Sequence, residues 1–322
     1  MQTRDLVAAL ADGEPCSGSE LARRFGVTRA AVWKRLSELR EAGLPLAAVA
    51  GRGYRLALPL ELLDADAIRS ALPGAVRARY GDIAVHWEID STSSELLRGA
   101  ASRSDLAVCL AEQQSAGRGR RGRQWQSPLL CNVYLSVLKR FERGMGSLAG
   151  LSLAVGVAVA RALERCGASA LQLKWPNDVL AGDGKLAGIL VELGGEFLGP
   201  CHAVIGIGVN LYLPEAVRAA IEQPVADLAT LCAPLPPRNQ VVAVLLDELA
   251  RVLDMFAADG FAALRGEFEI RDRLRGRTIT LSDADGVQHG QGAGVDARGA
   301  LLLRQGDTMA AFDSAEVTVR PA

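Results

Sequence analysis

Glycines and arginines alternate in one short segment that has the composition of an anion-binding loop. Residues 116–125, called the arginine loop below, read Ala-Gly-Arg-Gly-Arg-Arg-Gly-Arg-Gln-Trp, with four arginines within six residues. Each guanidinium offers a fork of donors that fits the oxygens of a phosphate or carboxylate. The loop therefore predicts a site for triphosphate or pyrophosphate. On this motif alone, a solvated loop and an RNA-binding arginine–glycine run stay open.

The same glycines have the spacing of a dinucleotide-binding fingerprint, but that interpretation is rejected. Gly117, Gly119 and Gly122 give Gly-x-Gly-x-x-Gly, which requires a helix to begin among the glycines so that its N-terminus meets pyrophosphate. Here Gln-Trp-Gln-Ser-Pro follows instead. A Walker loop is excluded as well, because Gly184-Lys185 is followed by leucine.

A second polar segment, Lys-Trp-Pro-Asn-Asp at residues 174–178, directly follows a predicted strand. Pro176 keeps Trp175 out of helical geometry, so the strand ends there. Asn177 and Asp178 are hard oxygen ligands suited to Mg²⁺ on a nucleotide. An ordinary Asn-Asp turn is the alternative.

Three further features are informative because of the residues around them. Lys185 opens an apolar strand among glycines, where it could neutralise a carboxylate and a phosphate that are being joined. Residues 206–210, Gly-Ile-Gly-Val-Asn, interrupt a strand with glycines, as a backbone packed beside a ligand requires. The hydroxyls of residues 91–93 lie between a strand and a helix, where they either cap the helix or bind a polar head group.

The N-terminal residues predict a helix-turn-helix. Ser17 and Glu20 form a capping box for one helix, Gly26 ends it, and Thr28 caps a second helix that reaches about residue 42. Between residues 21 and 37 there are five basic residues and no acidic one.

The outward side of the second helix and a following hairpin predict DNA binding. Trp33 is expected to face solvent, and an exposed indole favours a partner. A hairpin over residues 46–56 carries Arg52 at its tip, as a wing against phosphates would. The predicted DNA-binding residues are Thr28, Arg29, Ala30, Trp33, Lys34 and Arg52.

Apolar runs and helical patterns alternate through the middle of the chain, which indicates an α/β or α+β fold. The predicted strands are 83–89, 106–111, 132–138, 171–175, 186–192 and 203–210. The predicted helices are 94–101, 146–166, 241–258 and 261–274, after a linker and short helix from residue 59. Short strands at 278–281, 287–295, 300–303 and 317–320, with Gly and Asp turns, predict a small C-terminal β barrel.

Composition excludes several classes of protein. The chain of 322 residues is 49% hydrophobic and carries a net charge of −1, so it is neither disordered nor a general nucleic-acid coat. Six scattered cysteines give no zinc knuckle or disulfide framework. The most apolar stretch is shorter than the ~20 residues of a membrane span, and no signal peptide is recognised. A cytoplasmic protein without a membrane partner is expected.

Taken together and in this order, the motifs resemble those of the bacterial bifunctional biotin–protein ligases and biotin-operon repressors. The arginine loop, Lys-Trp-Pro-Asn-Asp and residues 185–192, Lys-Leu-Ala-Gly-Ile-Leu-Val-Glu, match that family essentially letter for letter. The resemblance covers nearly the whole chain. It implies a winged helix-turn-helix at residues 1–63, a mixed α/β ligase domain at 64–274 and an SH3-like barrel at 275–322.

The resemblance also implies roles for single residues, with Arg120 and Lys185 as the catalytic pair and Asp178 as a contact to Mg²⁺ through the nucleotide. Biotin would contact Ser91, Thr92, Ser93, Gln114, Arg118, Gly119, Arg120, Lys185 and Gly206. ATP and the adenylate would contact Arg118, Arg120, Arg121, Arg123, Trp125, Asn177, Asp178, Lys185, Asn210 and Arg320. The sequence departs from the family at Ser93, where asparagine is usual, and at Trp33, where a smaller polar residue is common.

The implied chemistry has two steps. Biotin and ATP with Mg²⁺ give biotinyl-5′-AMP, and biotin then passes to a lysine of the biotin carboxyl carrier protein of acetyl-CoA carboxylase. The adenylate-bound homodimer would repress biotin genes by binding operator DNA. The alternatives are a lipoate or octanoate ligase on the same fold, against which the complete arginine loop argues, and a ligand-sensing regulator without ligase activity.

Overall fold

Two capped helices and a hairpin form the N-terminal unit, as predicted. The computed structural model describes residues 2–11, 13–41, 43–56, 61–283, 286–313 and 318–321. Ser17 Oγ accepts from the backbone N–H of Glu20 at 3.1 Å, and Thr28 Oγ1 accepts from that of Ala31 at 3.2 Å. The elements are α1 (Thr3–Ala8), α2 (Gly18–Phe25), α3 (Arg29–Glu41), β1 (Leu46–Val49) and β2 (Gly53–Leu56). The short helix α1 was not predicted.

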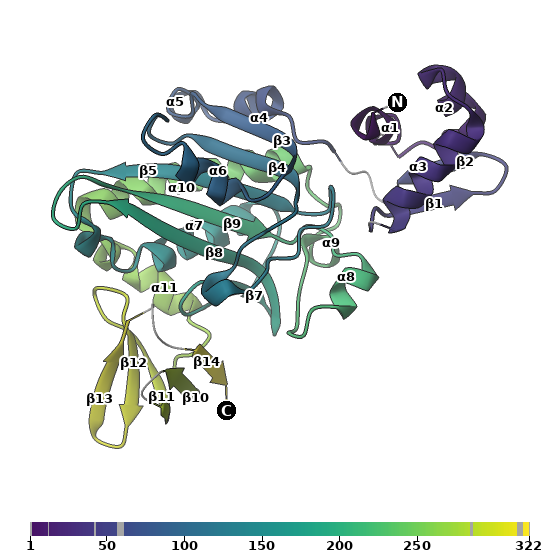
Figure 1. Ribbon diagram of the computed structural model, residues 1–322. Helices are drawn as coiled ribbons and strands as arrows, with labels where there is room; N and C mark the ends of the chain where they lie inside the picture. The colour runs from purple at the N-terminus through teal and green to yellow at the C-terminus, as the bar shows by residue number, and fades with distance from the viewer. Residues whose placement is uncertain are drawn as a thin grey trace.

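A seven-stranded sheet in the order β3-β4-β5-β9-β8-β7-β6 forms the centre of the molecule (Figure 1). Only the β3–β4 pair is parallel, so the predicted mixed class is confirmed. The strands are β3 (Ile83–Ile89), β4 (Val108–Gln114), β5 (Val133–Phe141), β6 (Leu171–Lys174), β7 (Asp178–Ala181), β8 (Gly184–Gly195) and β9 (Cys201–Val209). Strand β7 was not predicted; it pairs with β6 across the turn at residues 175–177.

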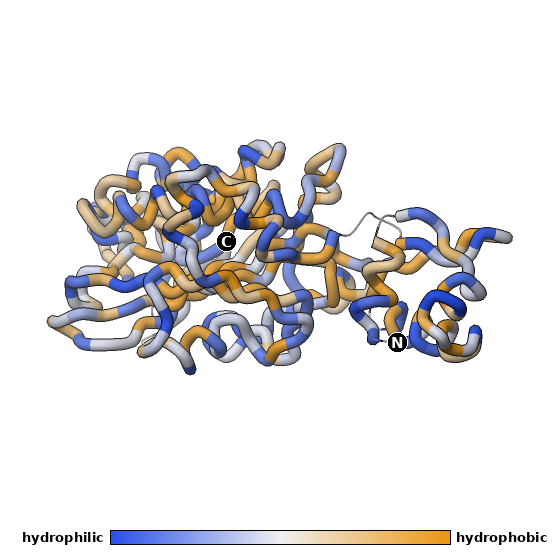
Figure 2. Tube along the Cα trace, turned by 90° about the horizontal axis from the view of Figure 1, so that it is seen from above, coloured by the Kyte–Doolittle hydropathy of each residue, from blue (hydrophilic) through white to orange (hydrophobic). Residues whose placement is uncertain are grey.

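The long apolar helices α7 and α10 cover one face of the sheet and α6 the other, and hydrophobic segments run through the middle of this body (Figure 2). The helices are α4 (Ala65–Ala71), α5 (Gly74–Arg77), α6 (Thr92–Arg98), α7 (Leu151–Arg165), α8 (Glu215–Ala219), α9 (Leu228–Leu231), α10 (Arg238–Asp259) and α11 (Arg265–Arg271). Short 3₁₀ turns lie at Arg120–Gly122, Met145–Leu148 and Phe261–Ala263. No helix in the described ranges is long and apolar enough to cross a bilayer.

Two predicted helices are shorter than expected. The prediction 146–166 is wrong at its start, because Gly150 has φ +81° and separates a 3₁₀ turn from α7. The prediction 261–274 is likewise divided into a 3₁₀ turn and α11, which ends at Arg271. The chain beyond α11 pairs instead with β6, where the N–H of Arg273 donates to the C=O of Leu173 at 2.9 Å.

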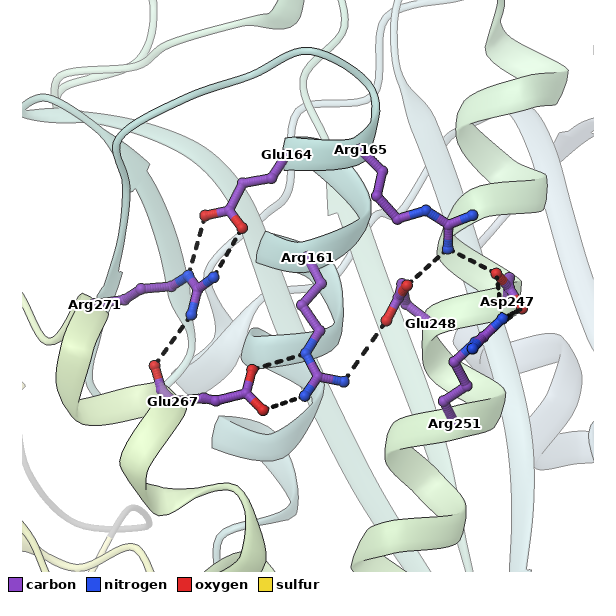
Figure 3. Close-up of polar contacts among 8 residues, drawn as sticks. All are labelled: Arg161, Glu164, Arg165, Asp247, Glu248, Arg251, Glu267 and Arg271. Carbon is purple, nitrogen blue, oxygen red and sulfur yellow. Dashed lines mark hydrogen bonds and ion pairs between the residues drawn. The ribbon is translucent and has the colours of Figure 1, made fainter.

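An ionic network ties the helices to one another (Figure 3). Its members are Arg161, Glu164 and Arg165 on α7, Asp247, Glu248 and Arg251 on α10, and Glu267 and Arg271 on α11. Arg271 on α11 reaches Glu164 at 2.8 Å, and Arg165 reaches Asp247 at 2.7 Å. Asp247 and Glu248 are buried, and charges joined in a network contribute more than isolated exposed pairs, which give at most about 1 kcal/mol each. The network orients α11, which leads into the last unit.

The C-terminal unit is a five-stranded antiparallel sheet in the order β13-β12-β11-β10-β14, consistent with the predicted SH3-like barrel. Its strands are β10 (Thr278–Asp283), β11 (Gly286–Val295), β12 (Leu301–Gln305), β13 (Thr308–Phe312) and β14 (Thr318–Pro321). Strand β13 was not predicted, and residue 317, predicted to start the last strand, lies outside the described residues.

Candidate active site and DNA-binding face

One pocket opens where the arginine loop crosses strands β4, β5, β8 and β9 of the central sheet. Side chains from each of the central motifs line it. The predicted residues among them are Ser91, Thr92, Ser93, Gln114, Arg118, Gly119, Arg120, Arg121, Arg123, Trp125, Asn177, Asp178, Lys185 and Gly206. The fold therefore brings together segments that are distant in the sequence.

A chain of buried hydroxyl groups forms one end of the pocket. Ser136 Oγ, fully buried on β5, lies 2.8 Å from Thr92 Oγ1 and 2.9 Å from Ser93 Oγ. Gln114 Oε1 accepts from the backbone N–H of Thr92 at 3.0 Å. A Cβ at Gly206 would lie 2.6 Å from Ser93 Oγ, so only glycine leaves room there. Convergent polar groups of this kind orient a small polar head group.

The hydroxyls of residues 91–93 divide between the two roles that the sequence left open. Ser91 is the N-cap of α6, and its Oγ accepts from the N–H of Ser94 at 3.5 Å. The hydroxyls of Thr92 and Ser93 contact Ser136 instead, and residues 91–93 all line the pocket. Ser93 therefore uses its hydroxyl within the buried chain, at the position where the family usually has asparagine.

Trp125, at the end of the arginine loop, packs against two glycines of the central sheet. Gly188 on β8 and Gly208 on β9 are paired neighbours. A Cβ at Gly208 would lie 2.4 Å from the indole Cε2, and one at Gly188 would lie 2.8 Å from Cζ3. The backbone N–H of Trp125 donates to the C=O of Gly117 at 2.9 Å, which closes the loop. No side chain larger than hydrogen fits between the indole and the sheet.

Lys185 is held in the pocket from both its backbone and its side chain. A β-bulge opposite Val179 and Leu180 interrupts the β7–β8 register beside Lys185, and bulges redirect side chains. Its Nζ lies 2.7 Å from Asp178 Oδ1 and 5.4 Å from the centre of the Trp125 ring. The ammonium is therefore fixed between an acidic and an aromatic group at the pocket wall.

Two arginines of the loop reach across the pocket to separate partners. Arg118 Nη2 donates to Glu192 Oε2 at 2.5 Å, and Arg120 Nη1 donates to Asn177 Oδ1 at 3.5 Å. Burial, with the neighbouring charge of Arg121, lowers the pKa of Arg120. A desolvated guanidinium beside another cation gains stability when an anion arrives, so the arrangement favours a phosphate or carboxylate at this place.

One predicted ligand contact, Asn210, does not line this pocket, and the side chain of another, Arg320, is not described. Asn210, which is buried, donates its side-chain amide to the C=O groups of Lys185 and Ala226, both at 3.1 Å. Its visible role is to hold the backbone of Lys185. Arg320 lies in β14, but its side chain is outside the described residues.

The donor set fits a magnesium ion only when a nucleotide carries it. Within the described ranges, no three His, Cys, Asp or Glu side chains gather to hold a metal by themselves. Mg²⁺ on a nucleotide needs only one or two protein oxygens in addition to phosphates and waters. Asp178 and Asn177 at the pocket wall supply such oxygens.

Several residues in the pocket, or in contact with its lining, were not predicted. Ser136 interrupts the apolar run of β5, and a lone hydroxyl in such a strand was the available signal. Glu192 is the last residue of the motif at residues 185–192, but no nearby sequence pattern identifies Arg118 as its hydrogen-bond partner. Tyr134 and Gln223 line the pocket itself, and they become neighbours only through the fold.

The predicted DNA-binding residues lie on one exposed face of the N-terminal unit. Thr28, Arg29, Ala30, Trp33, Lys34 and Arg52 are all exposed, and Trp33 retains 61% of its accessible surface. A groove between α3 and the β1–β2 hairpin is lined by Arg29, Trp33 and Arg52. A basic helix beside a basic hairpin tip has the geometry of a winged helix on a duplex.

Comparisons with known proteins agree with this geometry. The Biotin/lipoate A/B protein ligase family matches residues 88–210, and an HTH domain family matches residues 2–55. The bifunctional ligase/repressor BirA of Escherichia coli (strain K12) is 38% identical over 317 residues, 98% of this chain and 97% of that protein. The biotin--[acetyl-CoA-carboxylase] ligase of Paracoccus denitrificans is 37% identical over 67% of this chain and 91% of its own length.

A solved structure is similar as well. Biotin protein ligase from Aquifex aeolicus in complex with biotin and ATP has a TM-score of 0.65 and 26% identity, over 76% of this chain and 100% of that chain. The central sheet and its pocket thus define a protein ligase of the biotin and lipoate class. With its N-terminal DNA-binding unit and its full-length relatives, the chain belongs to the bifunctional biotin ligase/repressor family.

Proposed function

We propose that this protein activates biotin with Mg·ATP and transfers it to a lysine of the biotin carboxyl carrier protein of acetyl-CoA carboxylase. The observation that carries the proposal is a single pocket with buried hydroxyls at one end and a fixed lysine among arginines at the other. The hydroxyl end suits an uncharged polar ring. The cationic end suits a carboxylate beside phosphates. Activating biotin requires both.

In the first step, a biotin carboxylate oxygen bonds to the α-phosphorus of ATP, and the bond to the β-phosphate breaks to release pyrophosphate. Both reactants are anionic, so the main barrier that a protein can lower is their repulsion. Lys185 and Arg120 would supply positive charge where the reacting oxygens meet. In the second step, the carrier lysine's amine attacks the anhydride carbonyl, an amide forms and AMP leaves.

We assign biotin's ureido ring to the hydroxyl end, with Ser91, Thr92, Ser93, Gln114 and Gly206. The carboxylate and α-phosphate lie between the arginine loop and Lys185. The nucleotide lies toward Trp125, Asn177 and Asp178, with Asp178 contacting Mg²⁺ through the phosphates. Asn210 and Arg320 complete the proposed set, Asn210 by holding the Lys185 backbone.

A pyrophosphate-exchange assay tests the proposal against its closest alternative. Purified protein should exchange labelled pyrophosphate into ATP with biotin and Mg²⁺, and omission of biotin should abolish the exchange. Biotin should be the best substrate because its polar ring can use the remaining hydrogen-bonding capacity of the buried hydroxyl chain, which an acid without a polar ring leaves unused. Faster exchange with lipoate or octanoate would reassign the protein to lipoate-type ligases.

Replacing Arg120 with glycine should release the adenylate. Arg120 is half-buried, and it links the loop to Asn177 across the pocket. Without that link, biotinyl-5′-AMP should escape and label lysines of a bystander protein such as serum albumin about tenfold more than wild type does, while the melting temperature changes little. Arg120→Lys, which keeps the charge but not the fork of donors, should give intermediate labelling. Bystander labelling at the wild-type level would exclude a closing role for Arg120.

We further propose that biotinyl-5′-AMP makes the protein a homodimer that binds the operator of biotin genes. One winged helix offers few base contacts, whereas two read half-sites on the duplex. The division at residues 1–63, 64–274 and 275–322 would then separate DNA binding, catalysis and the barrel. A repressor shares a compartment with DNA, so we place the protein in the cytoplasm without a membrane partner.

A further inference from the structure

A tight turn of the C-terminal sheet contacts the back of the pocket. The indole Nε1 of Trp175 donates to the C=O of Gly299 at 3.0 Å, and Trp175 is only 1% exposed. The turn between β11 and β12 is itself well ordered by hydrogen bonds. Asp296 Oδ1 accepts from the N–H of Arg298 at 2.8 Å and from that of Ala300 at 2.9 Å. A turn tied in this way can serve as a fixed support.

The contact depends on two glycines that touch one another. Gly299 has φ +85°, and a Cβ on it would lie 2.8 Å from the Cα of Gly150. Gly150 precedes α7 with φ +81°, and its own Cβ would lie 2.7 Å from Phe261 Cβ and 2.9 Å from the C=O of Arg298. Any side chain at either position would push the turn away from α7. The sheet thus reaches Trp175 only because both residues are glycine.

The β11–β12 turn supports the residues that are assigned to ATP binding. Trp175 begins the turn of residues 175–177, and the C=O of Pro176 accepts from Ser152 Oγ on α7 at 3.0 Å. The same turn presents Asn177 to the arginine loop and leads into Asp178, which pairs with Lys185. Neither Gly299 nor Ser152 lines the pocket. Both hold the nucleotide side of the pocket from behind.

We propose that Gly299 is a positioning residue, and that the C-terminal sheet sets the affinity for ATP by holding the Trp175 turn in place. This inference rests on the proposed ATP site. The residues assigned to biotin's ring belong to β3–α6, β4 and β9, and none is hydrogen-bonded to this turn. A displaced turn should therefore weaken ATP binding and leave biotin binding nearly unchanged.

Two matched glycine variants separate positioning from general stability. Gly299→Ala introduces the clash with Gly150. Gly306→Ala, in the β12–β13 turn, also places alanine at a positive φ of +62°, but a Cβ there has nothing within 4 Å. Both variants place a side chain on a left-handed backbone. In pyrophosphate exchange, the KM for ATP should rise about tenfold or more for Gly299→Ala only, with the KM for biotin within about twofold of wild type for both.

A second pair covers the case in which Gly299→Ala does not fold. Asp296→Ala removes the acceptor that orders the turn, whereas Asp296→Asn keeps an oxygen at the same place. Asp296→Ala should raise the KM for ATP and Asp296→Asn should restore it, with folding checked by thermal unfolding. An unchanged KM for ATP in Gly299→Ala or Asp296→Ala, or an equal rise for biotin, would overturn the inference. A wild-type protein without biotin-dependent exchange would instead overturn the proposed function.

Discussion

Lys185→Ala is expected to slow biotin-dependent pyrophosphate exchange by about 100-fold or more. Removal of one preorganised charge-stabilising donor typically costs 10²–10³-fold in rate. Lys185 fits that role because its Nζ lies 2.7 Å from Asp178 and its backbone is held by Asn210. The substitution also leaves the Asp178 carboxylate without its cation, so a small loss of stability, about 1 kcal/mol, is expected as well.

The chain contains a close match for the surroundings of Lys185. Lys139 Nζ lies 2.6 Å from Asp105 Oδ2 and 5.7 Å from the centre of the Phe141 ring, outside the pocket. Lys139→Ala should therefore cost a similar amount of stability, measured by thermal unfolding, and leave exchange at the wild-type rate. If Lys185→Ala is no slower than Lys139→Ala, Lys185 has no part in the chemistry.

Biotinyl-5′-AMP is expected to tighten operator binding by about 10- to 100-fold over ATP alone, the usual range of coupling between two sites. The adenylate can couple to DNA binding because the segment that follows the arginine loop packs against the N-terminal unit. Leu129 and Leu130, just beyond the arginine loop, pack in the same buried cluster as Leu6, Leu36 and Leu56 of that unit. A ligand that orders the loop thus acts on residues in contact with the DNA-binding unit.

Point variants test this better than a deletion, because removing residues 1–60 would expose Leu129 and Leu130 beside the pocket. Arg29→Ala and Lys34→Ala should each weaken operator binding by ~1–3 kcal/mol and leave exchange unchanged. Arg40→Ala, in the last turn of the same helix, is the control and should change neither. Binding must be titrated at one fixed salt concentration. Equal operator affinity with and without the adenylate would remove the co-repressor role.

Local patterns predicted much of this fold and most of the pocket lining. Caps at Ser17 and Thr28 are side-chain-to-backbone bonds over three residues, so the sequence contains all that they need. The arginine loop and residues 174–178 were recognised because their residue types are unusual in any context. Their meeting in one pocket followed from the family resemblance, since neither motif specifies a distance to the other.

Features that depend on distant partners were not predicted. Ser136 matters because Thr92 and Ser93 lie beside it, on helix α6, 44 and 43 residues earlier in the chain. The start of α7 was misplaced because Gly150 adopts a left-handed conformation that accommodates Phe261 and the C-terminal turn. In both cases the contact that determines the local structure joins segments that are distant in the sequence. Local sequence patterns therefore do not reveal it.

The most direct test of biotin–protein ligase activity is the mass of the carrier domain after reaction. Incubated with this protein, biotin and Mg·ATP, the domain should gain the mass of one biotin minus one water, on a single lysine identified by fragmentation. No gain should occur without ATP, or when that lysine is replaced by arginine. An unmodified carrier domain, despite adenylate formation in the same tube, would contradict a ligase and leave a ligand-sensing regulator.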